Sequence, residues 1–169
     1  MRMMMRAMIG MLSLLFIVPL AAAVEVPLTT PVSGVVKTVL VTAGQSVKKG
    51  QLLLSLDDTI YQARVIEAEA GVSRLQAEAG EANKDLKRAQ ELYDRAVSST
   101  TEYDQAKLRH ARADGLYQEA RARLTIAKKN LEYTSLRAPF NATVSKRLAE
   151  PGMVVSPELQ PQALIVLSK

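Results

Sequence analysis

The most regular pattern in the sequence is a seven-residue repeat of apolar positions between residues 58 and 134. Two seam columns recur at heptad spacing in each half of this region, and the intervening positions are mostly polar. A sustained heptad is typical of a coiled coil rather than of an isolated amphipathic helix. The seam residues are Val65, Val72, Ala79, Leu86 and Tyr93 with Tyr61, Ala68, Leu75, Ala82, Ala89 and Ala96 in the first arm, and Tyr103, His110, Tyr117, Leu124 and Leu131 with Ala106, Ala113, Ala120 and Ala127 in the second.

The two sets of heptads also predict where the chain bends. If the arms fold back on each other so that Tyr93 faces Ala106, large seam residues meet small ones in most layers, as close packing of two helices requires. This pairing places the centre of the turn between Ser99 and Thr100, inside a run of four polar residues. We therefore expect an α-helical hairpin over residues 58–134 with its turn near residues 98–101.

Short β-rich runs with glycines between them precede and follow the hairpin, in residues 24–57 and 135–169. In the first segment, residues 35–36, 39–41 and 52–54 are typical of strands. The second segment repeats the first at a constant offset, which indicates a duplicated half-domain. The matched positions are Pro31 and Pro139, Val36 and Val144, Leu40 and Leu148, Gly44 and Gly152, and Val47 and Val155.

A segment of about thirty residues is too short to bury a hydrophobic face by itself. Two such halves can close a small β-sandwich if they pack together at the base of the hairpin. The predicted fold class is therefore α+β, with a long antiparallel coiled-coil hairpin inserted into a split β-sandwich.

Residues 1–23 have the pattern of an export signal. Arg2 and Arg6 form a basic start, residues 7–20 are apolar, and the alanines at 21–23 provide a cleavage site. An uncleaved membrane anchor is the alternative, because the apolar run is close to the shortest length that spans a bilayer. The small residues at its end favour cleavage, and under either reading the rest of the chain is exported.

Composition excludes several kinds of site. The formal charge of +5 includes Arg2 and Arg6 of the export signal, and the other charges are interspersed along the helices, as on solvated coiled-coil flanks rather than on a nucleic-acid surface. Without cysteine the chain has no disulfide and no thiolate ligand or nucleophile. The single histidine, His110, lies on the seam, where a polar residue sets helix register. We expect no catalytic residues, no metal site and no cofactor.

The flanking segments resemble a known family, the periplasmic adaptor or membrane fusion proteins (HlyD-like, of the RND efflux adaptor type) of bacterial efflux and secretion systems. The residues that carry the resemblance are Pro31–Val36, Val41–Leu52, Leu136–Phe140, Val144–Leu148 and Glu150–Gly152. The resemblance implies a biotinyl/lipoyl-like domain split by the hairpin and covers essentially all of the chain after residue 23. It also implies a location in the periplasm, associated with the inner membrane. Family members usually continue into a β-barrel and a membrane-proximal domain, so we interpret this sequence as a short form without them.

Lipoyl and biotinyl carrier domains have the same kind of sandwich, so a carrier function is an alternative. A carrier needs a lysine at the turn that joins its two halves. Here Asp57 and Asp58 lead into the hairpin instead, and no lysine occurs between Gln51 and Gly80. We expect these aspartates to cap the amides at the start of the helix. The sequence therefore disfavours a carrier.

Near the turn, Arg88, Leu92 and Ser99 have the spacing Arg-x3-Leu-x6-Ser. This spacing resembles the hairpin-tip motif with which efflux adaptors dock on a TolC-like outer-membrane channel. Arg88 and Leu92 are one helical turn apart and lie off the seam, so the coiled coil does not need them. Ser99 also has a structural alternative, because with Glu102 it forms the Ser-x-x-Glu pattern of a helix capping box.

The resemblance implies a non-catalytic adaptor subunit that bridges an inner-membrane transporter to a TolC-like outer-membrane channel and assembles as a homo-oligomer. The missing domains are those that contact the transporter, so that partner is the less defined of the two. A truncated or degenerate adaptor remnant and a periplasmic coiled-coil scaffold without a transport role are the alternatives.

Overall fold

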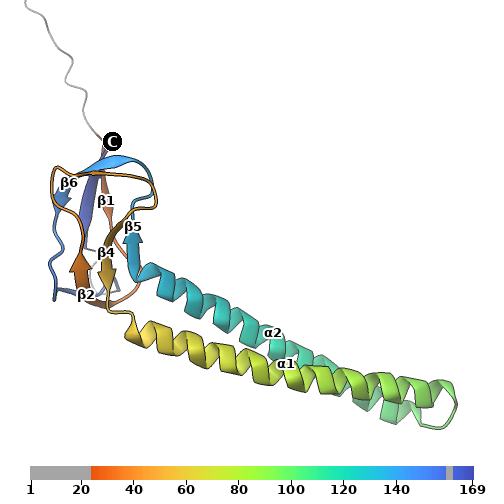
Figure 1. Cartoon of the computed structure of the whole chain (residues 1–169). Coiled ribbons are helices and arrows are strands. Elements are labelled where there is room, and N and C mark those ends of the chain that lie inside the picture. Colours follow the sequence, from red (N-terminus) through yellow and green to blue (C-terminus); the bar gives the residue numbers. More distant parts are fainter. Residues whose placement is uncertain (1–23, 159–161) are drawn as a thin grey trace, which may run out of the picture.

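A computed structural model describes residues 24–158 and 162–169, and it shows a β-sandwich from which a long helical hairpin extends (Figure 1). The α+β class and the insertion of the hairpin between two β-rich segments are as predicted. The expected export signal at residues 1–23 lies outside the described residues. Among the helices described, none is long and apolar enough to cross a membrane.

Two four-stranded sheets, antiparallel throughout, form the sandwich. The first sheet has the order β1 (Glu25–Leu28), β8 (Ile165–Ser168), β6 (Ala142–Arg147) and β3 (Ser46–Val47). The second has the order β5 (Ser135–Arg137), β4 (Leu52–Leu56), β2 (Gly34–Val39) and β7 (Val154–Val155). The runs expected as two strands at 35–36 and 39–41 belong largely to one strand, β2, whose pairing with β4 has an irregularity between Val36 and Thr38.

The internal repeat is visible in this topology. Strands β1, β2, β3 and β4 of the first half correspond to β5, β6, β7 and β8 of the second half. If each strand is exchanged for its counterpart, the strand order of one sheet becomes that of the other. Gly44 and Gly152 are equivalent and adopt φ of +84° and +86°, a left-handed conformation that glycine enters at little cost. Their amides donate at 2.8 Å to the carbonyls of Val144 and Val36, each in the other half. Each sheet thus contains strands from both halves, so neither half closes alone.

The sandwich interior is one continuous hydrophobic core. Repeat partners occupy equivalent buried places, as Val36 and Val144 do in the two sheets. Burial of leucine and valine side chains is the main source of stability for a domain of this size. The largest fully buried apolar side chains are Leu53, Leu54, Leu56, Leu164, Ile165 and Leu167.

The hairpin consists of α1 (Thr59–Asp94) and α2 (Thr100–Tyr133), of 36 and 34 residues. Every predicted seam position is buried or half-buried except Tyr93 and Ala96 at the tip, so the heptad pattern correctly identifies the contact between the helices. Only three seam residues, Ala79, Ala106 and Ala120, are buried, and the others are half-buried or exposed. The seam is narrow because alanine occupies so many of its positions.

The turn comes earlier than expected. Residues 95–99 connect the helices, and Thr100, expected at the centre of the turn, is already the first residue of α2. Tyr93 stacks on Tyr103 with ring centroids 5.2 Å apart, so the arms pair about one turn away from the expected contact with Ala106. The physical reason is Ala96, whose φ of 56° ends α1 before the polar run begins.

Three hydrogen bonds hold the base of the hairpin against the sandwich. The Thr30 hydroxyl donates to the Tyr133 carbonyl at 2.8 Å, and the Tyr61 hydroxyl donates to the Ser33 carbonyl at 2.6 Å. The Leu56 amide, at the end of β4, donates to Thr134 at 2.8 Å. Because both helices are attached in this way, the sandwich sets the direction of the hairpin.

Candidate functional site: the hairpin tip

The tip lies at the end of α1 and the start of α2, at the opposite end of the hairpin from the sandwich (Figure 1). At 1.5 Å per residue, the 36 residues of α1 span about 54 Å. Packing against the small sandwich does not require a helix of this length. The three residues predicted from the sequence, Arg88, Leu92 and Ser99, all lie in the last part of this arm or just past its turn.

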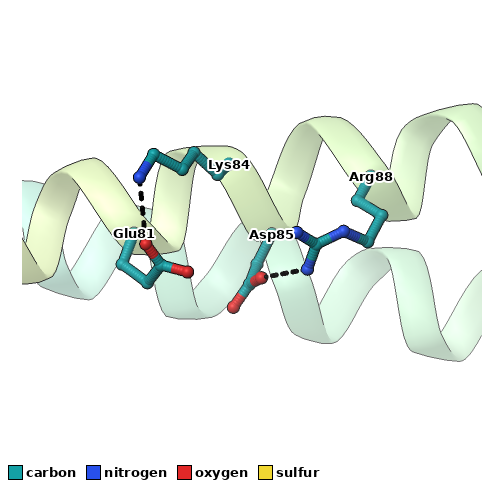
Figure 2. A network of polar contacts seen from close by, with 4 residues as sticks. All are labelled: Glu81, Lys84, Asp85 and Arg88. Carbon is teal, nitrogen blue, oxygen red and sulfur yellow. Dashed lines mark hydrogen bonds and ion pairs between the residues drawn. The ribbon is translucent and has the colours of Figure 1, made fainter.

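Arg88 extends from the exposed side of α1. Its Nη1 donates to Oδ1 of Asp85 at 2.9 Å, one turn earlier, as Figure 2 shows. The two side chains are 67% and 44% exposed, so solvent screens the pair and it contributes little to stability. The guanidinium therefore retains most of its donors for a partner that presents carbonyls or carboxylates.

Leu92 is 39% exposed although it belongs to the last turn of α1. Its carbonyl accepts from the amides of Val97 at 2.9 Å and Ser98 at 3.3 Å. This bond from Val97, with Ala96 in a left-handed conformation, is the Schellman arrangement that ends many helices. Alanine is an unusual residue at this place, where glycine is preferred, so the tip conformation is maintained at some cost.

Ser99 has the structural role that its sequence context predicted. Its Oγ accepts from the amide of Glu102 at 3.3 Å, and the Glu102 carboxylate accepts from the Ser99 amide at 2.9 Å. This is a complete capping box for α2. Arg88 and Leu92 are therefore one turn apart on the same helix, whereas Ser99 lies across the loop and is engaged with its own helix.

The structure adds two apolar residues to the tip that the sequence reasoning did not identify. Val97 is 71% exposed in the connecting loop, and Tyr93 is 38% exposed beside Leu92. We call Leu92, Tyr93 and Val97 the apolar tip. A signal for Val97 was present, because a β-branched apolar residue is unusual in an exposed polar turn. Tyr93 was assigned to the seam and instead stacks on Tyr103 at the tip end of the seam.

No group of three or more metal-ligating side chains occurs among the residues that the structure describes. Hydrogen bonds from Thr59 lower the pKa of Asp57, which thereby satisfies the amide of the first residue of α1 at 3.0 Å. Of the two aspartates expected to cap the helix, Asp57 makes a hydrogen bond to a helix amide and Asp58 does not. The Asp58 carboxylate instead accepts a hydrogen bond from the side-chain amide of Gln62.

Comparison with known proteins places these features in a family. Residues 25–161 match the family described as the CzcB-like barrel-sandwich hybrid domain. The multidrug export protein AcrE of Escherichia coli is 33% identical over 125 residues, which cover 74% of this chain and 32% of AcrE. The efflux pump periplasmic linker BepF of Brucella suis is 33% identical over 89% of this chain and 37% of its own length.

A solved structure shows the same architecture. A crystal structure of a MacA–MexA chimeric protein, which contains the α-hairpin domain of Pseudomonas aeruginosa MexA, superposes with a TM-score of 0.64 and 27% identity. The match covers 85% of this chain and 47% of the chimeric protein. This chain thus spans about a third of the length of the curated relatives it matches. It belongs to the CzcB-like barrel-sandwich hybrid family and is a relative of the periplasmic adaptor, or membrane fusion, proteins.

Proposed function

We propose that this protein is a non-catalytic periplasmic adaptor subunit of a tripartite efflux or secretion system. In this function several copies surround the pump axis, next to an inner-membrane transporter, and each hairpin tip binds a TolC-like outer-membrane channel. The names of its relatives, which include a multidrug export protein and an efflux pump periplasmic linker, support the class of function. The transporter and the channel are partners proposed for this chain.

The observation that carries the proposal is the exposed tip on its long arm. Leu92 and Val97 present apolar surface to solvent where neither the seam nor the sandwich uses it. Arg88 lies one turn from Leu92 and offers hydrogen-bond donors beside that apolar surface. An apolar centre with an arginine at its edge is the composition of a protein-binding surface. The partner we propose presents helical ends with free carbonyl or carboxylate groups.

The test is a charge placed in the apolar tip. We expect Leu92→Asp to reduce the amount of outer-membrane channel that co-purifies with the tagged protein by about tenfold or more, since burial of an unpaired carboxylate is costly. Ile60→Asp is the control, because Ile60 is also a large apolar residue with an exposed side chain, 62% against 39% for Leu92, but lies at the other end of α1. Co-purification is measured after crosslinking in cells, with helix content checked by circular dichroism. Unchanged recovery of the channel with Leu92→Asp would contradict tip docking.

A further inference from the structure

The sandwich has two ends, and only one of them joins the hairpin. The other end is built by the turn at residues 48–50 and the loop at residues 137–141. Strand β4 runs from this end towards α1, and β5 runs to it from α2, so the pair of Leu52 with Arg137 lies far from the helices. Figure 1 shows the C-terminus at this same end, opposite the hairpin.

The end away from the hairpin carries three cations. Lys48, Lys49 and Arg137 are exposed, and we call them the basic end. Nη1 of Arg137 donates to the Gly50 carbonyl at 3.0 Å, and the Lys49 amide donates to Oδ1 of Asn141 at 2.8 Å. These bonds join the turn to the loop and keep the three cations together. None of the three forms an ion pair among the residues that the structure describes.

The internal repeat shows that the fold does not require these charges. At the offset of the repeat, the turn at residues 48–50 corresponds to residues 156–158, and the loop at residues 137–141 corresponds to residues 29–33. These counterparts contain no lysine or arginine, and one of their residues is Glu158. The sandwich therefore closes at its hairpin end without positive charge, although the two halves have the same arrangement of strands.

Neighbouring groups do not neutralise the basic end. The nearest acidic residue by strand register is Glu25, and its carboxylate already accepts from Nζ of Lys146 at 3.1 Å. Lys169 adds a further cation, since its Nζ lies 5.6 Å from the centroid of the Phe140 ring in the same loop. A cluster of like charges without counterions in the protein is a surface that attracts an anionic partner.

The described part of the chain also begins at this end. The Lys169 amide donates to the Val24 carbonyl at 3.3 Å, so the first described residue lies beside the last strand. Residues 1–23 directly precede Val24, and their sequence is typical of an export signal. Whether it is cleaved or kept as an anchor, such a segment delivers Val24 to the periplasmic face of the inner membrane. Export therefore brings the basic end to the membrane surface.

From this charge and this position we propose that the basic end binds the anionic phospholipid headgroups of the inner membrane. Lysine and arginine donate charge-assisted hydrogen bonds to phosphate oxygens. The hairpin then extends from the opposite end of the sandwich, away from the bilayer. The inference takes its periplasmic location from the proposed function and does not depend on what the tip binds.

Vesicle binding by the full exported protein tests the proposal. Co-sedimentation at low salt compares vesicles of phosphatidylcholine alone with vesicles that also contain phosphatidylglycerol. We expect stronger binding to the mixed vesicles, and we expect it to weaken as salt is added. The triple variant Lys48→Gln, Lys49→Gln, Arg137→Gln should lose about a hundredfold in affinity for the mixed vesicles, since each cation near an anionic surface contributes about fivefold.

A second triple variant, Lys87→Gln, Arg109→Gln, Arg112→Gln, is the matched control. It removes the same charge from exposed positions on the hairpin, and none of these cations forms an ion pair within the described residues. We expect it to bind the mixed vesicles as the unmodified protein does. Equal losses in the two triple variants, or equal binding of the unmodified protein to both kinds of vesicle, would overturn the proposal.

The double variant Lys48→Gln, Lys49→Gln separates a loss of charge from a loss of folding, because it leaves the Arg137 bond to the Gly50 carbonyl in place. We expect about a 25-fold loss in affinity for the mixed vesicles with an unchanged circular dichroism spectrum. Leu92→Asp should leave vesicle binding unchanged. Failure of tip docking and failure of lipid binding are therefore seen in different variants and different measurements.

A fluorescent label tests the orientation, since the chain has no cysteine of its own. Pro139→Cys places the label in the loop of the basic end, and Thr101→Cys places it at the tip, both at exposed positions. Lipids with a nitroxide on the headgroup quench a dye that lies close to the bilayer surface. We expect quenching of the label at position 139 and none at position 101. Equal quenching at both positions would contradict binding through the basic end.

Discussion

The sandwich and the hairpin of this protein are stabilised in different ways. In the sandwich, 14 buried residues form one core of leucine, valine, isoleucine and alanine. In the hairpin, which is the longer region, only Ala79, Ala106 and Ala120 are buried. Alanine contributes little apolar area but is the best helix former, so the hairpin depends on backbone propensity and many small contacts. A region organised in this way keeps most of its surface exposed for contacts with other molecules.

The difference in stabilisation between the sandwich and the hairpin is tested most directly by removing a large side chain from each region. Leu54 is completely buried in the sandwich, and we expect Leu54→Ala to lower the free energy of unfolding by about 2–5 kcal/mol. Leu86 is only half-buried on the seam, and alanine is favourable in a helix, so Leu86→Ala should cost about 1 kcal/mol or less. Urea denaturation followed by far-ultraviolet circular dichroism measures both. Equal losses would show that the hairpin has a core of its own.

A smaller effect distinguishes local from global stability in the hairpin. Ser99→Ala removes the cap of α2 and should cost about 1 kcal/mol. We expect the loss to be confined to the first turn of α2, where hydrogen exchange of the backbone amides would become faster. Ser98→Ala is the matched control, since the Ser98 hydroxyl is buried and has no hydrogen-bond partner among the described residues. If exchange rose throughout the sandwich as well, the two regions would unfold together.

The smallest predicted effect is a pH dependence specific to the sandwich. Hydrogen bonds from Ser145 and Lys146, and the charge of Lys146, lower the pKa of Glu25 below its usual 4.5. A lowered folded-state pKa stabilises the protein above the usual pKa, and this contribution is lost as pH falls through the folded-state value. We expect Glu25→Gln to reduce the loss of stability on acidification, measured by urea denaturation at several pH values. Asp57, whose pKa is also lowered, accounts for part of the remaining dependence, so Asp57→Asn should reduce it further. A slope unchanged by Glu25→Gln would exclude this contribution.

The sequence predicted the features that depend on repeated patterns. The heptad identified the seam residues along both arms, since burial on a helix recurs with the same period as the sequence signal. The duplicated segments identified the sandwich, and Gly44 and Gly152 were matched correctly because their turns need the same left-handed backbone. The family resemblance follows from these same segments, and the comparisons bear it out.

Features that depend on a single residue were not predictable in the same way. The predicted turn lay too far along the chain because a positive φ is usually marked in the sequence by glycine, and here it occurs at Ala96. Strands β3 and β7 have two residues each, too few for any alternating pattern. The sequence therefore did not predict that each of them pairs with a strand of the other half. The role of Arg88, Leu92 and Ser99 in binding a partner stays a prediction.

The exchange of strands between the halves has a consequence for folding. The halves of the sandwich are separated by about seventy helical residues, and a flexible loop of that length would have to lose considerable entropy before β4 could pair with β5. Helices form within microseconds from contacts close in sequence, and pairing of the arms brings Leu56 next to Thr134. The hairpin thus raises the effective concentration of one half of the sandwich around the other.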